Sequence, residues 1–309
     1  MNEALSREDA SLEQPSTTPG ERRLRFFTPW LPALTGVWLI VYLTAFEDPG
    51  RLFLQRWPLI VAGVFGALVG NATAIGGGLV FIPLLIGVYR LDPVSALKLT
   101  FVTQAVGMTS GAAGWIRRGT VPLQALVWTV PPLVVGSAIS TFVVHPNPML
   151  VKGLFGPTSM LVGSLALILA GKQGTRDSIP RRGLPWIVAV SLFGGLLTGW
   201  VAIGEGEVVA AFLMLACGLR APQGIGLGVV LLSINSILLA LVHALHFGGV
   251  PWSMAIFTIL GVLWGGRLGP YVAQLVRPAR LKRFFGGVAM LDGALFFGQF
   301  LLSILAKSR

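Results

Sequence analysis

Residues 74–80 read AIGGGLV and residues 202–208 read AIGEGEV, and these two stretches decide the fold. Each interrupts a long hydrophobic segment, 57–88 in the first case and 185–217 in the second. The arms beside each interruption are about 10 to 15 residues, or roughly 15 to 22 Å as helix, too short to cross a hydrocarbon core of about 30 Å. Glycine lets the backbone leave the helix, and such backbone persists at membrane depth only where protein or a wet cavity satisfies it. We therefore expect two broken or re-entrant helices.

The two interrupted segments indicate an internal duplication. Residue 74 corresponds to residue 202, and the same offset pairs Leu91 with Leu219 and Leu99 with Leu227. Farther along, GTVP at residues 119–122 matches GGVP at residues 248–251 after a shift of one position. Corresponding Gly-interrupted segments in two halves of a membrane protein are typical of transporters whose binding site lies near the bilayer midplane.

The composition excludes a soluble domain. The chain has 309 residues, of which 54% are hydrophobic and only 11% are charged, whereas soluble domains carry about 25% charged residues. Seven further apolar segments approach the roughly 20 residues that a membrane span requires. We predict these spans at about 30–46, 94–116, 121–144, 149–170, 221–245, 250–268 and 284–305. The single Cys217 excludes a disulfide framework.

The positive charges give an orientation. The net charge is +11, but the basic residues lie in short loops beside hydrophobic segments, which indicates membrane topology and not nucleic-acid binding. We place the N-terminus in the cytoplasm of a bacterial cell, with each interrupted stretch returning to its own side or crossing twice. The basic clusters 117–118, 172–182 and 267–283 then all face the cytoplasm. On this path the two repeats are inverted, so the predicted fold is an all-α, polytopic inverted-repeat helical bundle in the inner membrane.

The predicted organisation has five parts. Residues 1–28 are polar and read as a disordered cytoplasmic tail. The other four are an additional N-terminal span and loop at 29–56, a first transport repeat at 57–171, a basic cytoplasmic loop at 172–183 and a second, inverted transport repeat at 184–309.

Residues 75–83, IGGGLVFIP, are followed by an apolar, loop, apolar rhythm that reaches Arg117, Arg118 and Gly119. This pattern resembles the TauE/SafE family of membrane permeases over about residues 57–305. The resemblance implies export of sulfite, sulfonates and related sulfur-containing anions. The second copy departs from the glycine triplet, because Glu205 and Glu207 stand where the first copy has Gly77 and Leu79.

Glu205 and Glu207 are the sharpest functional candidates. An ionised carboxylate inside a membrane is unfavourable unless it is paired, hydrated or protonated, and such residues commonly mark proton or substrate pathways. We predict that one or both couple transport to protons. A structural interpretation stays open, in which the carboxylates accept hydrogen bonds from the unwound backbone and hold the break together.

The two breaks are also the predicted anion site. A helix that restarts after a break presents free N–H groups and the positive end of its dipole, which suit a sulfonate or carboxylate oxygen. Neutral side chains beside the breaks add donors, although each can equally bond one helix to another. The predicted substrate-binding residues of this kind are Asn71, Thr73, Gly76, Gly77, Gly78, Gly204, Gly206, Ser233 and Asn235.

Two more predicted site residues lie on the span at 94–116. Lys98 near its start either reaches the membrane surface or faces the site as a counter-charge, and both interpretations stay open. Gln104 lies farther along the same helix, on a path that continues toward the site. Asp292, in the last span, is expected to pair with a basic residue such as Arg267 or Lys282 rather than to contact substrate.

The sequence therefore predicts a secondary transporter, most consistent with an exporter, of a small anion such as sulfite, a sulfonate or a carboxylate. No cofactor, metal site or nucleic-acid partner is predicted, and a homodimer is left open. A cation or metal permease that uses Glu205 and Glu207 as ligands is one alternative. An intramembrane enzyme is another, but no Ser/His/Asp or His-Glu-x-x-His pattern supports it.

Overall fold

The computed structural model describes residues 30–170, 174–176, 179–276 and 278–307. Within these ranges the chain is helical, and the only β-type pairing is an isolated bridge between Arg176 and Leu219. The all-α prediction is confirmed. The predicted disordered tail lies outside the described residues, as does part of the predicted basic loop.

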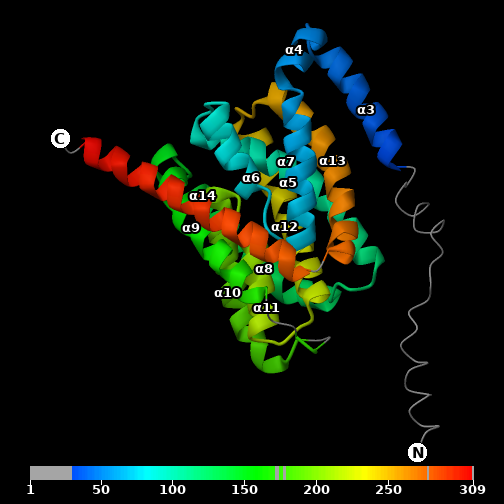
Figure 1. The fold of residues 1–309 in the computed structure, drawn as a ribbon, viewed down its shortest axis with the longest axis vertical. Helices are drawn as coiled ribbons and strands as arrows, with labels where there is room; N and C mark the ends of the chain where they lie inside the picture. The colour runs from blue at the N-terminus through cyan, green and yellow to red at the C-terminus, as the bar shows by residue number, and fades with distance from the viewer. Residues whose placement is uncertain (1–29, 171–173, 177–178, 277, 308–309) are drawn as a thin grey trace, which may run out of the picture.

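The helices follow the predicted order (Figure 1). Helix α3 (Trp30–Ala45) is followed, after a bend of 117°, by α4 (Pro49–Arg56). The next elements are α5 (Pro58–Thr73), α6 (Gly78–Pro83) with its continuation η2 (Leu84–Val88), α7 (Pro93–Arg117), η3 (Leu123–Ala125), α8 (Leu126–Ala138), η4 (Ile139–Val143) and α9 (Pro148–Leu169). The remaining elements are η5 (Arg181–Gly183), α10 (Leu184–Val201), α11 (Glu205–Leu215), α12 (Ala221–Leu241), η6 (Val242–Phe247), α13 (Trp252–Leu275) and α14 (Pro278–Lys307).

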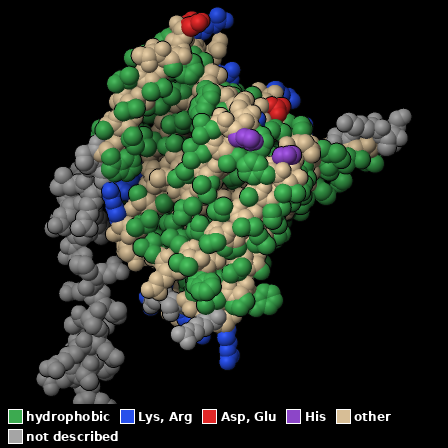
Figure 2. Space-filling view, turned by 180° about the vertical axis from the view of Figure 1, so that it is seen from behind, with side chains coloured by type: hydrophobic (Ala, Val, Ile, Leu, Met, Phe, Trp, Pro, Cys, Tyr) green, Lys and Arg blue, Asp and Glu red, His purple; other side chains and the backbone are tan. Residues whose placement is uncertain are grey.

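The outer surface is that of a membrane protein. Among the described residues, six helical segments are long and apolar enough to cross a membrane: η3 to η4, α9, α10, α12 with η6, α13 and α14. Hydrophobic side chains cover the middle of the face in Figure 2, and charged side chains lie mainly toward its two extremities. Helix α7 is not among the six because it carries several polar residues, but most of these are buried inside the bundle, including Thr100, Thr103 and Gln104.

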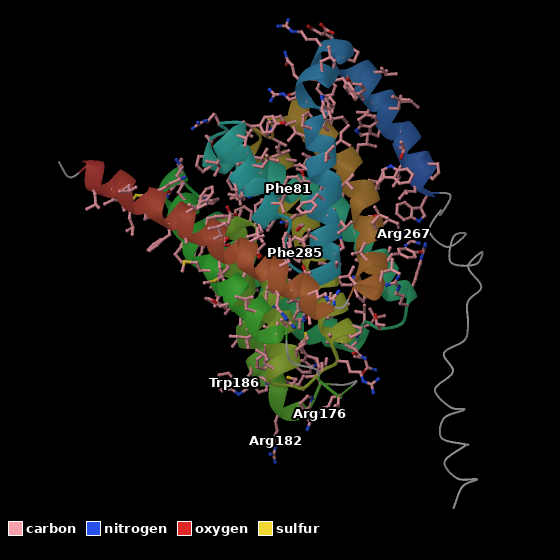
Figure 3. All side chains as sticks on the ribbon, in the orientation of Figure 1. Phe81, Arg176, Arg182, Trp186, Arg267 and Phe285 are labelled. Atoms are coloured by element: carbon pink, nitrogen blue, oxygen red, sulfur yellow. The ribbon has the colours of Figure 1, made fainter. Side chains whose placement is uncertain are left out.

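Both interrupted stretches are helical hairpins that return to the end of the bundle where they start. Arg56, just before α5, lies over the ring of Tyr89, just after η2, with its guanidinium carbon 5.6 Å from the ring centroid. Arg176, in the segment before α10, pairs with Leu219, which follows α11. Each stretch therefore begins and ends at the same end of the bundle. We call the end where the first stretch starts the α5 end, and the end where the second stretch starts the α10 end. Figure 3 shows Arg176 and Arg182 at the α10 end.

The hairpin arms differ in length from the prediction. Helix α5 has 16 residues and α10 has 18, so they are roughly 24 and 27 Å long. The return arms are shorter, with 11 residues in α11. The prediction of short arms was wrong for the two incoming helices, because the glycines do not stop them and each continues to the residue just before the break.

The backbone repeats its conformation at equivalent positions of the two halves. Ala74 and Ala202 both end their helices in the left-handed region, with φ of 63° and 57°. Leu91 N donates to Leu85 O, and the equivalent Leu219 N donates to Leu213 O, each at 3.0 Å. We interpret these correspondences as two copies of one unit that enter the bundle from opposite ends. The boundaries predicted for each copy remain a prediction.

Close helix contacts hold the copies together. Helix α5 packs on α13, and the equivalent α10 packs on α8. At the first contact Gly63 and Gly261 lie so close that a Cβ on Gly63 would be 2.7 Å from the carbonyl oxygen of Thr258. Small residues allow such approach where lipid supplies no hydrophobic drive between helices. Helices α9 and α14 pair similarly along one flank (Figure 1).

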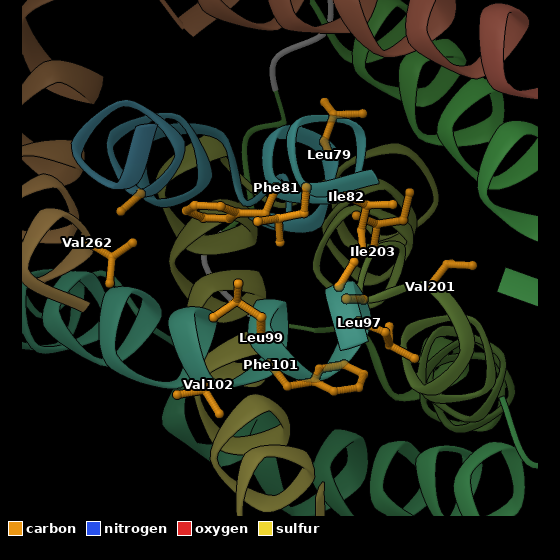
Figure 4. Close-up of a cluster of buried hydrophobic side chains, with 14 of the residues drawn as sticks. Leu79, Phe81, Ile82, Leu97, Leu99, Phe101, Val102, Val201, Ile203 and Val262 are labelled. Carbon is orange, nitrogen blue, oxygen red and sulfur yellow. The ribbon is translucent and has the colours of Figure 1, made fainter. Parts of the chain in front are cut away.

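A hydrophobic cluster surrounds the meeting point of the hairpins (Figure 4). Phe81 and Ile82 of α6 lie beside Leu97 and Phe101 of α7, and Ile203 joins them from the break of the second hairpin. All five side chains are buried. This packing fixes the first turn of α6 against the second break and so positions the site.

Candidate functional site

The tips of the two hairpins interlock. A Cβ on Gly78 would lie 2.5 Å from the carbonyl oxygen of Ala202, and a Cβ on the equivalent Gly206 would lie 2.7 Å from the carbonyl oxygen of Ala74. Each left-handed alanine thus presents its carbonyl to the opening turn of the other hairpin. Only residues without a Cβ allow this approach. The two breaks, which are far apart in sequence, form one buried structure.

Glu207 joins the two breaks. Its Oε2 accepts the N–H of Gly204 at 3.1 Å, as a Glu at the third position of a helix commonly does for the residue that caps it. Its Oε1 accepts the N–H of Gly76, in the first hairpin, at 2.5 Å. The side chain is 5% exposed. A carboxylate therefore already occupies the position where backbone N–H groups of the two breaks converge.

Gln104, on α7, joins the second hairpin to α12. Its Nε2 donates to the carbonyl of Ala202 at 2.7 Å, and its Oε1 accepts the Ser236 hydroxyl at 3.0 Å. The sequence placed Gln104 near the site but gave no sign of Ser236. Because Gln104 holds the carbonyl of a residue in the left-handed conformation, it stabilises the turn that ends α10.

Glu205 lies on the opposite side of the second break. One carboxylate oxygen, Oε2, accepts from the side-chain amide of Asn235, while its backbone N–H donates to the hydroxyl of Thr198 at 3.2 Å. The other oxygen, Oε1, is buried with no hydrogen-bond partner among the described residues, and so is Asn235 Oδ1. Buried oxygens normally accept a hydrogen bond. A water molecule or a substrate can donate it, or the carboxyl group itself can carry a proton.

The polar residues of the first hairpin hold helices together. Asn71 donates to the carbonyls of Ala67 at 2.8 Å and Gly107 at 3.1 Å, and so ties α5 to α7. The hydroxyl of Thr73 donates to Val69 O at 2.8 Å and accepts the N–H of Ile75 at 3.1 Å. Both side chains are buried. Thr73 closes the end of α5 and therefore lies at the break itself, whereas Asn71 packs behind it.

Two predicted site residues make their contacts elsewhere. Ser233 pairs with the hydroxyl of Thr109 at 2.7 Å and joins α12 to α7. Lys98 donates to the carbonyl of Gly248 at 2.8 Å, in the loop between η6 and α13 at the α5 end. This contact is the one expected of a lysine that reaches the membrane surface, and the role of Lys98 stays a prediction.

Replacement of Lys98 by Met should therefore affect stability more than transport. The lost hydrogen bond to Gly248 contributes about 1 kcal/mol, so the melting temperature in detergent should fall by a few degrees. The KM for the transported anion should stay within about twofold of the wild-type value. A large rise in KM with an unchanged melting temperature would return Lys98 to the binding site.

A small cavity lies beside Glu207. It has a volume of about 20 Å³ and is lined by residues that include Thr73, Glu207, Met214 and Lys282. That volume holds about one water molecule. In this structure the cavity is therefore too small for an anion of several atoms. The surrounding helices must move apart to admit one.

No group of three His, Cys, Asp or Glu side chains among the described residues is arranged to hold a metal ion. Comparison with curated proteins and with solved structures gave no match. The family model described as "Sulfite exporter TauE/SafE" matches residues 59–296, from the second residue of α5 to the middle of α14. That match spans both hairpins and most of the chain, so the protein belongs to the TauE/SafE family of membrane transporters.

Proposed function

We propose that this protein is a secondary transporter of a small oxyanion such as sulfite or a sulfonate, which it binds at the backbone N–H groups of the two helix breaks. The observation that carries the proposal is the bridge made by Glu207. A carboxylate accepts hydrogen bonds from Gly76 and Gly204, which belong to different hairpins. Groups that hold the oxygens of one anion can hold those of another.

The same bridge favours an anion over a cation. In a cation permease, carboxylate oxygens face a space where the ion sits, because hard cations take oxygen ligands. Both oxygens of Glu207 instead face N–H donors. Sulfite and sulfonate groups have several acceptor oxygens, and they are therefore complementary to a site built from donors.

Glu207 also supplies a way to couple anion and proton movement. A second anion that approaches Gly76 and Gly204 meets the charge of the carboxylate already there, and two like charges at one site repel each other. A proton on Glu207 removes its charge and weakens its hold on the N–H groups, because hydrogen bonds to ionised acceptors are the stronger ones. Proton uptake by Glu207 and anion binding then favour each other. Glu205, whose Oε1 has no hydrogen-bond partner among the described residues, is the second candidate for the proton.

The expected orientation places the α10 end in the cytoplasm. Arg118, Arg176 and Arg182 lie at that end: Arg118 donates to the carbonyl of Pro270 near the end of α13, and Figure 3 labels the other two. Basic residues are retained on the cytoplasmic side of a membrane. Export then proceeds from the α10 end to the α5 end of the bundle.

The proposal is tested with purified protein in liposomes. We expect uptake of labelled sulfite that is accelerated by a pH gradient, weaker uptake of sulfoacetate or another sulfonate, and no flux of Mn²⁺ or Zn²⁺ above that of empty liposomes. A divalent-cation flux without any anion flux would replace the proposal by the cation permease. Absence of all flux, from protein shown to be folded by its thermal transition, would reject both.

A further inference from the structure

Lys282 is a buried cation that has no charged partner among the described residues. It lies in the first turns of α14, and only 4% of its surface is exposed. Among the described residues, the one polar contact of its ammonium group is the sulfur of Met214, at 3.6 Å. A thioether is a weak acceptor, whereas an ammonium group carries three strong donors. Within the part of the chain that the structure describes, most of the hydrogen-bonding capacity of Lys282 is therefore unused.

The expected pairing of Lys282 with Asp292 does not occur. The two residues are ten positions apart on one helix, which separates them by roughly 15 Å along its axis. For Lys282 the expectation was wrong because residues on one helix meet at spacings of three or four positions. Buried charges are normally paired, so the position of Lys282 requires another explanation.

Lys282 lines the same cavity as Glu207 and Thr73. The cavity continues along α11 past Ala210 to Met214, and its other walls come from α9 and from Ile225 in the first turns of α12. Helix α11 returns to the α10 end, and both α12 and α14 start there. The cavity therefore lies between the helix breaks and the α10 end, on one side of the site.

We propose that Lys282 is the loading residue for the anion on the α10 side, where its ammonium group holds the substrate before the anion replaces Glu207 at the N–H groups of Gly76 and Gly204. This inference rests on the proposed function and adds a second, asymmetric subsite to it. The first half of the described chain has no equivalent buried lysine. The element equivalent to α14 is α9, and its Lys152 is exposed at the α5 end.

The arrangement has a direct chemical consequence. An ammonium group attracts any oxyanion as a point charge and does not impose the planar two-point geometry of a guanidinium. Lys282 should therefore raise the affinity for anions from the α10 side without selecting strongly among them. Selection among anions then depends on the N–H groups of the breaks, which have fixed directions.

The test compares three substitutions of Lys282 with a matched control in sided membrane vesicles. Lys282→Gln and Lys282→Met remove the charge, and Lys282→Arg keeps it. Arg283→Gln removes the same charge from the next residue, which is exposed. Initial rates of labelled sulfite transport are measured with substrate on the α10 side and, separately, on the α5 side.

For both neutral variants we expect KM on the α10 side to rise about tenfold, as for the loss of a charged hydrogen bond. The maximal rate and the KM on the α5 side should change by less than about twofold. Lys282→Arg should restore most of the affinity, and Arg283→Gln should behave as the wild type.

Three results would overturn the proposal while leaving the transporter function intact. One is an unchanged KM in folded Lys282→Met, and another is an equal rise in KM for Arg283→Gln, which would indicate a general surface charge effect. The third is failure of both neutral variants to fold while Lys282→Arg folds, because the ammonium group would then be structural. Absence of sulfite transport by the wild-type protein would instead reject the proposed function itself.

Discussion

Replacement of Gly78 by Ala should abolish transport and destabilise the protein, whereas the same change at the neighbouring Gly77 should be tolerated. A Cβ on Gly78 would lie 2.5 Å from the Ala202 carbonyl oxygen and 2.7 Å from Cγ2 of Ile203. A Cβ on Gly77 would meet nothing closer than 3.4 Å, and its φ of −58° suits alanine. The two variants therefore differ in whether the second hairpin must move.

The expected magnitude follows from overpacking in a buried site. Such substitutions cost about 1 to 3 kcal/mol, which lowers the melting temperature by roughly 5 to 10 °C at the upper end of that range. Transport should be lost even where the protein still folds. Displacement of Ala202 also displaces Gly204, whose N–H donates to the carboxylate of Glu207. Thermal unfolding in detergent and sulfite flux in liposomes measure the two effects.

The equivalent glycine provides an independent check. Gly206→Ala would place a Cβ 2.7 Å from the carbonyl oxygen of Ala74, and it should give a defect similar to that of Gly78→Ala. Gly77→Ala is the control for both. Wild-type transport by Gly78→Ala would mean that the hairpin tips do not interlock as the structure has them.

Replacement of Glu207 by Gln should remove the response of transport to a pH gradient. Glutamine has one acceptor oxygen in its side-chain amide, so it can satisfy the N–H of Gly76 or of Gly204 but not both, and it cannot carry the proton. We expect gradient-driven sulfite flux to fall at least tenfold, as for loss of a proton-transfer group. Exchange of labelled for unlabelled sulfite at equal pH, which needs no net proton movement, should persist.

Two controls separate this effect from misfolding and from general charge loss. Glu47→Gln removes an acid that is exposed in the loop between α3 and α4, and it should leave flux unchanged. Glu205→Gln tests the second carboxylate of the break, whose Oε2 keeps its contact with Asn235 only if the amide presents its oxygen. Normal gradient-driven flux in both Glu207→Gln and Glu205→Gln would exclude these acids from coupling.

Hydrophobicity and glycine placement predicted the elements well because they act locally. Helices lie at all seven predicted spans, and both glycine-containing interruptions separate two helices. The boundaries agree closely where proline begins a helix, as at Pro93 of α7 and Pro148 of α9. Proline fixes φ and lacks an N–H, so it favours the first turn of a helix whatever the surrounding fold.

The conformation of the breaks was less predictable. The turns begin at Ala74 and Ala202 in the left-handed region, and not at the glycines that follow. Alanine disfavours that region by about 1 to 2 kcal/mol. Both alanines have their carbonyl oxygens packed against the opposite hairpin, and Gln104 also bonds that of Ala202. Contacts that hold such a conformation in place come from residues far away in sequence.

The sequence by itself determined that the protein is a helical membrane protein, that it contains two glycine-interrupted segments and that two acids lie in the second one, because length, hydrophobicity and residue identity set these features. Only the tertiary structure decided that Glu207 bonds the first break, that Lys98 bonds a distant loop and that Lys282 lines the cavity beside Glu207. These contacts join residues that the chain separates by tens to more than a hundred positions. They arise where helices far apart in sequence pack together, and no local pattern encodes which side chain each will contact.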